Sequence, residues 1–236
     1  MSITLDKPIY KDWSLYEMVW ACLFTLLVII FGISSHDTLL DMVSGATGVI
    51  NILLCAKGKY SNYYFGIIYV GTYAYIAWTQ NLYATCFLFA CYFLPMQFIG
   101  LYLWKKNQQK VQEGTENSGI VVAKMGKVEL LTWSVLAILA IVILTLVLKK
   151  MHDPMPFFDA SSSILSIIGM VWMTRRFFEQ WYLWFISNSL TIVIWVVIFF
   201  HARDGHISQL IMNCAFFLNN FYGIYCWRKL IQKQEV

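Results

Sequence analysis

The chain alternates between uncharged apolar runs and short polar breaks along its length. Apolar runs of about 20 residues are long enough to cross the hydrocarbon core of a bilayer as helices. The pattern predicts eight transmembrane helices, with limits near residues 17–34, 40–56, 61–79, 82–104, 129–148, 157–174, 178–200 and 206–227. We therefore expect an all-α polytopic membrane protein surrounded by the lipid bilayer.

The distribution of charged residues predicts how the chain is oriented across the membrane. Only 13% of the residues are charged, and alternating the eight spans across the membrane places fourteen of the 17 Lys and Arg on the side of both termini. Because basic loops mark the cytoplasmic side, both termini are expected in the cytoplasm. The net charge of +4 is spread over short loops rather than one patch, so no nucleic-acid partner is expected.

Residues 105–128 form the longest polar stretch and are expected to be a flexible cytoplasmic loop. The halves on either side of it match. Gly100, Tyr102 and Trp104 correspond to residues 123 positions later, and both sets precede two basic residues. Closer to the amino terminus a shift of 117 fits, with an insertion at residues 202–206. It pairs Ser44 with Ser161, Lys59 with Arg176, Tyr60 with Phe177, Tyr64 with Trp181 and Trp78 with Trp195.

The matching halves predict two parallel three-helix repeats joined by a linker helix (3+1+3), with an extra helix at the amino terminus. This is the architecture of the sugar-transporting SWEET proteins, which bind their ligand between the repeats. Chance similarity between apolar helices is the alternative. The predicted organisation is an N-terminal segment with the extra helix (1–36), a first repeat (37–106), a loop with the linker helix (107–156), a second repeat (157–230) and a tail (231–236).

Polar residues inside the apolar runs are the candidates for function. Trp181, Trp184 and Asn188 are three and four residues apart, so they share one face of a helix. Two indoles and a carboxamide suit a ligand that carries a flat ring and several hydrogen-bonding groups. Alternatively, the tryptophans are ordinary membrane residues and the Asn bonds a neighbouring helix.

Further amides are predicted at a similar depth. Counting about 1.5 Å per helical residue from the nearest flanking charge puts them about 9 to 14 Å into the membrane. Amides that face lipid are costly, so amides at one level are expected to line one cavity. They are Asn51, Gln97, Asn188 and Asn220, with Asn219 beside the last of them.

No ionisable residue lies in the middle of a predicted span, which favours a facilitator over a proton-coupled carrier. Asp41 and Asp159 are interpreted as helix N-caps. The four histidines lack ligand spacing and the six cysteines lie singly in apolar runs, so we expect no metal site and no disulfide framework. Because nucleotide-binding and hydrolase motifs are absent, we expect no cofactor and no catalytic residues, and therefore not an enzyme.

At Trp181, Trp184 and Asn188, and at Pro95, Gln97, Gly100 and Trp104, the chain resembles the PnuC family of bacterial nicotinamide riboside transporters, from about residue 40 to 229. The resemblance implies a homotrimer in the bacterial inner (plasma) membrane that moves nicotinamide riboside by facilitated diffusion. It also implies that Trp181 and Trp184 contact the nicotinamide ring.

By the same resemblance, Asn188 contacts the carboxamide or ribose and Gln97 the opposite side of the ligand. A pyridinium cation over indole faces gains cation–π attraction without a buried carboxylate. Asn51, Tyr64, Asn219 and Asn220 are candidates by depth and repeat position alone. Two alternatives stay open: a carrier of another small polar solute (a sugar, a nucleoside or another vitamin), and a membrane receptor that does not transport.

Overall fold

The computed structural model describes residues 13–79, 83–112, 120–202 and 207–234. Within these ranges the chain forms eight helical spans, so the all-α fold is confirmed. Lys7, Lys11 and residues 203–206 of the predicted insertion at 202–206 lie outside the described residues. The spans are α1 (Leu15–Ser34), α2 (Leu39–Ala56), α3 (Asn62–Thr79), one span made of α4 (Tyr83–Leu88), η1 (Phe89–Phe93) and α5 (Leu94–Gln112), α6 (Lys127–Lys150), α7 (Pro156–Thr174), α8 (Gln180–Ala202) and α9 (Ile207–Gln234).

Apolar composition and local capping explain most of these helices. Among the described residues, five helical stretches are long and apolar enough on their own to cross a membrane: α1, α2, residues 86–108, α6 and α7. At the start of α2, Thr38 is the N-cap and Asp41 closes a capping box with it. At the start of α7, Met155 is the N-cap and Asp159 lies in the first turn. The interpretation of both aspartates as N-caps is therefore wrong, although each lies in a first turn that favours negative charge.

The fourth span contains one turn of π-helix, η1. Its cap N–H, on Leu94, bonds the carbonyl of Phe89, five residues back. Pro95 follows directly and has no N–H to give to the preceding turn, which is a known cause of a local change in helical winding. The apolar run at 82–104 predicts one uninterrupted helix here.

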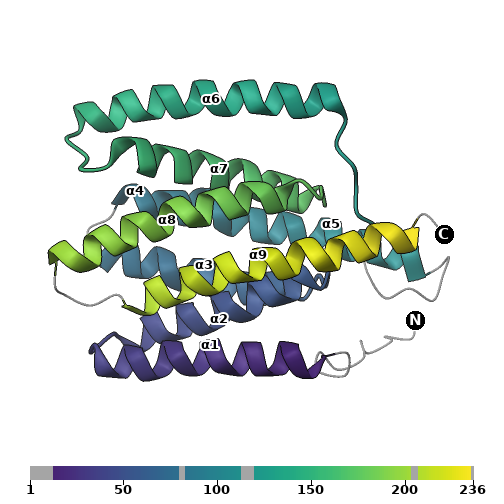
Figure 1. Ribbon diagram of the computed structural model, residues 1–236, viewed down its shortest axis with the longest axis horizontal. Coiled ribbons are helices and arrows are strands. Elements are labelled where there is room, and N and C mark those ends of the chain that lie inside the picture. Colours follow the sequence, from purple (N-terminus) through teal and green to yellow (C-terminus); the bar gives the residue numbers. More distant parts are fainter. Residues whose placement is uncertain (1–12, 80–82, 113–119, 203–206, 235–236) are drawn as a thin grey trace.

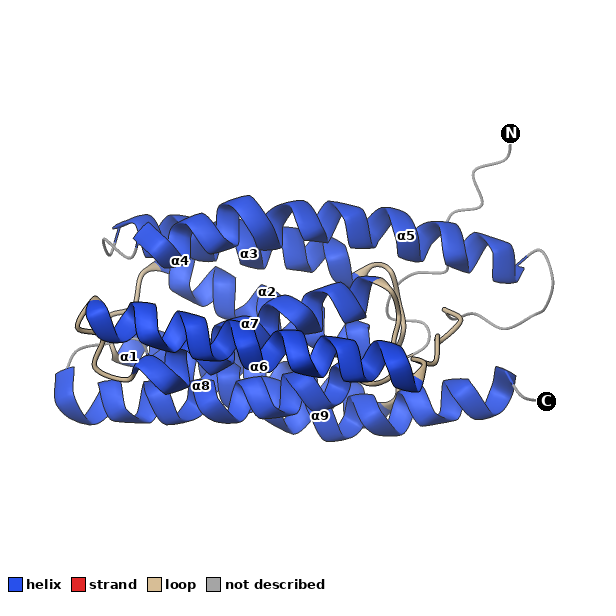
Figure 2. Cartoon of the chain, turned by 90° about the horizontal axis from the view of Figure 1, so that it is seen from above, coloured by secondary structure: helices blue, strands red, loops and turns tan. Residues whose placement is uncertain are grey.

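Six helices form a ring in the order α2, α3, α5, α7, α8, α9, and each packs against its two neighbours in that order. Exchanging α2 with α7, α3 with α8 and α5 with α9 reproduces the same set of contacts. Figure 2 shows α3 and α5 on one side of the molecule and α8 and α9 on the other, with α2 and α7 between them. The two halves therefore have equivalent packing.

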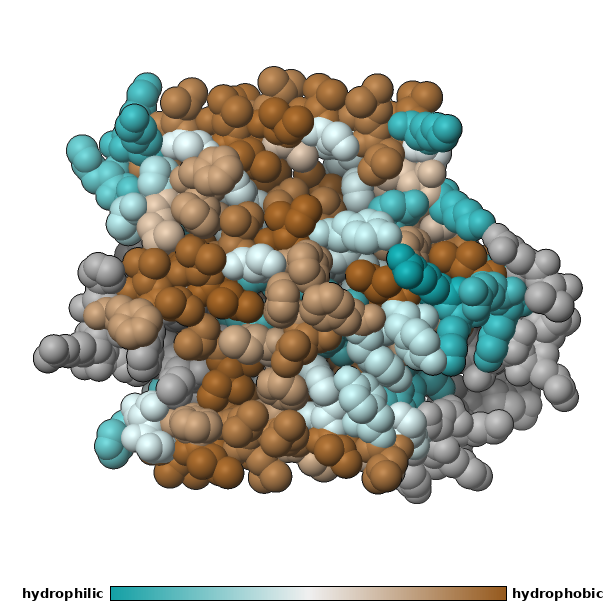
Figure 3. Space-filling view, in the orientation of Figure 1, coloured by the Kyte–Doolittle hydropathy of each residue, from teal (hydrophilic) through white to brown (hydrophobic). Residues whose placement is uncertain are grey.

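The remaining helices, α1 and α6, flank the ring on opposite sides (Figure 1). The first packs on α2 and α9, and the second on α7. Apolar side chains cover both of these outer helices, whereas hydrophilic side chains gather at the ends of the molecule (Figure 3). An apolar belt between two polar ends is the surface expected of a protein that spans a bilayer.

The end of the molecule at which α5 and α9 end is here named the linker end (Figure 1). The prediction of a flexible loop at 105–128 is wrong for residues 105–112 and 127–128, which are helical, whereas residues 120–126 lie outside the helices. The first residues of this stretch extend α5 to Gln112, because Lys and Gln are good helix formers outside the membrane. Residues 120–126 then lie along the linker end, where Ala123 pairs with Phe177, and α6 begins at Lys127.

Candidate functional site

Two glycines fix how the repeats correspond. A Cβ added to Gly100 would collide with the ring of Tyr63, and one added to Gly223 would collide with the ring of Trp181. Tyr63 and Trp181 therefore occupy equivalent places, 118 positions apart. The predicted shift of 117, which paired Tyr64 with Trp181, is wrong by one residue.

The turns after α2 and α7 confirm the shift of 118. Lys57 caps α2 and Arg175 caps α7 with closely similar backbone angles. The next residues, Gly58 and Arg176, both have positive φ, at 67° and 62°. Because such a conformation is uncommon, its recurrence at the same step marks the two turns as equivalents.

Tyr64 is the one predicted site residue that the structure sets apart from the others. Its ring lies edge-on to Tyr60 and is 46% exposed, on the outer face of α3 that also carries Ile68. The equivalent pair in the second half is Phe178 and Tyr182, again edge-on. The inward position on α3 belongs to Tyr63, which is completely buried.

In the first half, two predicted amides meet at Gly66. A Cβ on this glycine of α3 would collide with Gln97 Oε1 of α5 and would lie 2.8 Å from Asn51 Nδ2 of α2. Asn51 also donates to the backbone carbonyl of Asn62 at 2.8 Å. Both amides are buried, and Oε1 of Gln97 has no hydrogen-bond partner in the protein. The absence of a side chain at Gly66 is what makes room for them.

In the second half, an indole occupies the corresponding place. Trp184 of α8 packs on Gly169 of α7, and a Cβ added there would lie 3.2 Å from the indole. These two residues are the counterparts, at a shift of 118, of Gly66 and Asn51 respectively. The indole Nε1 of Trp184 is buried without a partner. One half therefore presents amides where the other presents a flat aromatic ring.

The remaining predicted amides lie on α8 and α9 and are buried. Asn219 donates to the carbonyl of Ile52 at 3.0 Å, which ties α9 to α2 beside Asn51. Asn220, the repeat counterpart of Gln97, is fully buried and neither polar atom of its amide has a partner. Asn188 also keeps its Nδ2 group unpaired.

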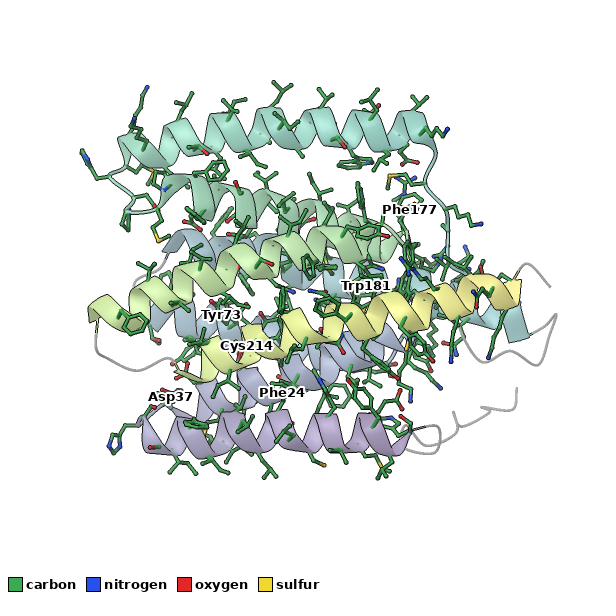
Figure 4. All side chains as sticks on the ribbon, in the orientation of Figure 1. Phe24, Asp37, Tyr73, Phe177, Trp181 and Cys214 are labelled. Atoms are coloured by element: carbon green, nitrogen blue, oxygen red, sulfur yellow. The ribbon has the colours of Figure 1, made fainter. Side chains whose placement is uncertain are left out.

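Trp181 is completely buried. Its ring lies where α8 and α9 cross (Figure 4) and meets the ring of Trp227 edge-on at 5.7 Å between centroids. Its indole Nε1 has no partner, as for Trp184. Ser187 lies one to two turns after Trp181 on α8. Its hydroxyl donates to the backbone carbonyl of Ser162 and bonds the hydroxyl of Ser166, and these bonds join α8 to α7.

Unpaired buried polar groups are costly and rare, so a group of them needs an explanation. Among the predicted site residues they are amides of Gln97, Asn188, Asn219 and Asn220 and the indole N–H groups of Trp181 and Trp184. Amides give and accept hydrogen bonds and indoles offer flat faces, so the arrangement suits a ligand with a ring at one end and polar groups at the other.

Gly66 and Tyr63 shape this region but are not among the site residues predicted from the sequence. The signal lay in the repeat itself. At the shift of 118, Gly66 of the first repeat corresponds to Trp184 of the second, and Asn51 corresponds to Gly169. The two repeats therefore differ in side-chain size at both positions.

Comparison with known proteins agrees with this fold. Residues 38–229 match a family described as the nicotinamide mononucleotide transporter. A nicotinamide riboside transporter PnuC from Haemophilus influenzae is 32% identical over 99% of this chain and 98% of its own length. The Neisseria mucosa protein of the same name is 29% identical over 97% of this chain and 87% of its own.

Among solved structures, the crystal structure of the vitamin B3 transporter PnuC superposes with a TM-score of 0.77 and 30% identity over 94% of each chain. The resemblance expected from the sequence is thereby confirmed, and proteins of this kind are transporters rather than enzymes. With matched packing in both halves and a family match across residues 38–229, the chain belongs to the nicotinamide mononucleotide transporter (PnuC) family.

Proposed function

We propose that this protein carries nicotinamide riboside across the bacterial inner membrane and binds it between the two repeats. The observation that carries the proposal is the likeness to nicotinamide riboside transporters over nearly the whole chain. The polar groups without partners at Trp184, Asn188, Gln97 and Asn220 support the same place for the ligand.

The riboside is a better candidate than the mononucleotide for which the family is named. The two molecules differ by a phosphate group, and proteins bind phosphate with charged donors such as Arg and Lys. The candidate residues are amides and indoles, and no Lys or Arg occupies the middle of a predicted span. The pyridinium ring of the riboside, in contrast, gains cation–π attraction over Trp184.

Within this site we assign Trp184 and Trp181 to the nicotinamide ring, and Asn188 to its carboxamide or to the ribose. Gln97, Asn51, Asn219 and Asn220 face the rest of the ligand. Tyr64 is left out because its side chain lies on the outer face of α3. Movement is by facilitated diffusion, since no ionisable group in mid-span is available for coupling.

The proposed orientation places the linker end and both termini in the cytoplasm, and the proposed assembly is a homotrimer. Alternating the predicted spans across the membrane puts fourteen of the 17 basic residues on that side. A cysteine placed in residues 105–128 of an otherwise cysteine-free chain should stay unlabelled when an impermeant thiol reagent is added outside whole cells. Labelling from outside would reject the orientation.

Titration calorimetry with nicotinamide riboside, nicotinamide mononucleotide and an unrelated nucleoside tests the ligand. Binding of the riboside alone is the expected result, and preferential binding of the other nucleoside or of a sugar would favour a different solute. Counterflow in proteoliposomes then separates a carrier from a receptor. Accumulation above the external concentration that an ionophore abolishes would contradict facilitated diffusion.

A further inference from the structure

Four fully buried aromatic rings cross from one repeat to the other at the linker end. Tyr63 and Trp104 meet edge-on at 5.2 Å, Trp104 and Trp227 are 6.0 Å apart, and Trp227 meets Trp181 at 5.7 Å. The order of the rings is symmetric, because Tyr63 corresponds to Trp181 and Trp104 to Trp227. The central contact therefore joins two equivalent residues.

The two central tryptophans also form reciprocal hydrogen bonds. The indole N–H of Trp104 on α5 donates to the carbonyl of Met173 on α7, at 2.9 Å. That of Trp227 on α9 donates to the carbonyl of Cys55 on α2, at 3.1 Å. Each repeat thus fastens its third helix to the last turn of the first helix of the other repeat.

These rings lie on the same side of their helices as the candidate ligand amides. Trp104 follows Gln97 by seven residues and Trp227 follows Asn220 by seven, which is about two turns and about 10 Å of helix. A ligand between the amides would therefore meet the aromatic rings next on its way toward the linker end.

Residues 120–123 add a second layer below the rings. Ile120 is buried, and its side chain and that of Leu230 on α9 both approach Gly58, in the turn after α2. The N–H of Val121 donates to Asn107 on α5, and its carbonyl accepts from Arg176 in the turn after α7. This segment thus contacts the cytoplasmic ends of both repeats.

We propose that Trp104 and Trp227, with residues 120–123 below them, form the cytoplasmic gate of the transport path. Opening this end requires α2 to separate from α9 and α5 from α7. Both indole hydrogen bonds then break, and water replaces the ring contacts. Because the central contact is shared, release of one tryptophan removes the packing of the other, so the two halves of the gate open together.

The gate rests on the proposed transport function, but its first test does not depend on the ligand. Cys55 is buried at the gate with 1% exposure, so its thiol reports opening. In a chain that keeps this cysteine alone, the other five being replaced by Ala, Trp104→Phe and Trp227→Phe are compared. Phe keeps an aromatic ring and removes the N–H. Maleimide labelling of the purified protein should become several-fold faster in both.

Trp104→Phe is the decisive variant because Trp104 bonds Met173 and not Cys55. Faster labelling of Cys55 in this variant requires that the two halves open together. Trp172→Phe is the control, since Trp172 is also buried but packs on Trp133 of α6. Labelling that rises only in Trp227→Phe, or in neither variant, would overturn the proposal.

A second test avoids substitution of the tryptophans. Cysteines at Ile120 and Leu230, in a chain without other cysteines, are joined by a short thiol cross-linker. The expected result is loss of counterflow with retained riboside binding, and a cross-linker that a reductant cleaves should restore counterflow. Full counterflow with the cross-link in place would reject the gate. Lack of riboside binding in the parent protein would instead reject the proposed ligand and leave the labelling result intact.

Discussion

Asn51 and Gly66 in the first repeat occupy the places that Gly169 and Trp184 occupy in the second. In the first repeat the larger side chain is the amide of Asn51 on the first helix. In the second repeat it is the indole of Trp184 on the second helix. At the linker end, by contrast, Trp104 and Trp227 keep the same residue type and the same kind of bond. The halves have therefore diverged at the centre and remained alike at one end.

This difference is what the proposed function would require of the two regions. At the linker end the two repeats only pack against each other, and the equivalent residues Trp104 and Trp227 can do this in the same way. A ligand with a flat cationic ring at one side and a hydroxyl-bearing sugar at the other is not symmetric. Two identical half-sites would each match only part of it, whereas an indole on one side and amides on the other match the whole.

The outer helices α1 and α6 each form an ion pair with the ring of six helices, and the two pairs differ in burial. On α1, Glu17 binds Lys57 at 2.8 Å and accepts from Tyr222 of α9 at 2.7 Å, with both charged side chains under 10% exposed. On α6, Glu129 binds Arg175 at 2.6 Å, but these side chains are 34% and 46% exposed. Lys57 and Arg175 cap equivalent helices, and the two ion pairs differ in the burial of their side chains.

The largest predicted effect uses this contrast. Glu17→Gln removes the buried carboxylate that binds Lys57 and Tyr222, and should lower the free energy of unfolding by about 3 to 5 kcal/mol. The exposed pair is screened, so Glu129→Gln should cost at most about 1 kcal/mol. Unfolding in mixed detergent and SDS measures both. Equal losses would mean that burial does not distinguish α1 from α6.

The second prediction concerns the shift of 118. Gly100→Ala and Gly223→Ala each push a Cβ into an aromatic ring, so each should cost about 1 to 3 kcal/mol of stability. Gly71 has open space around its added Cβ, and Gly71→Ala should be neutral or slightly stabilising. The same unfolding assay applies. A large loss in only one of the first two variants would argue against equivalent packing of the repeats.

Apolar runs and the repeated Gly-x-Tyr-x-Trp pattern were sufficient to predict the eight spans and the 123 shift. The shift predicted for the part of each repeat nearer the amino terminus, 117, is wrong by one residue. The reason is that Tyr63 and Tyr64 are adjacent aromatic residues on α3, and either could be aligned with Trp181. Only the packing of a ring on a glycine of another helix distinguishes them. The position of residues 120–126 was missed for a similar reason, since it depends on contacts with distant turns.

The third prediction tests the centre directly. Trp184→Ala removes the indole proposed to stack on the ligand and should weaken riboside binding at least tenfold, or about 1 to 3 kcal/mol. Asn188→Ala should cost a similar amount by leaving a polar group of the ligand unpaired. Trp78→Ala, at an exposed tryptophan of α3, is the control. Calorimetry on protein with a normal elution profile decides, and parent-like binding by both site variants would place the ligand elsewhere.

The smallest predicted effect separates the amide side from the indole side. The Cβ of Gly66→Ala would collide with the amides of Gln97 and Asn51, but these groups lie at the ends of flexible side chains and can move aside. Riboside affinity should therefore fall only a few-fold, about 0.5 to 1 kcal/mol. Stability should change little, because Ala favours the helix and offsets the crowding.

Gly169→Ala is the matched variant for the indole side, since its Cβ would press on the rigid ring of Trp184. An indole cannot bend away as an amide can, so this variant should lose more affinity than Gly66→Ala. The reverse order would mean that the amides, and not the indole, hold the ligand most tightly. The divergence of the two halves would then have to be explained by packing alone.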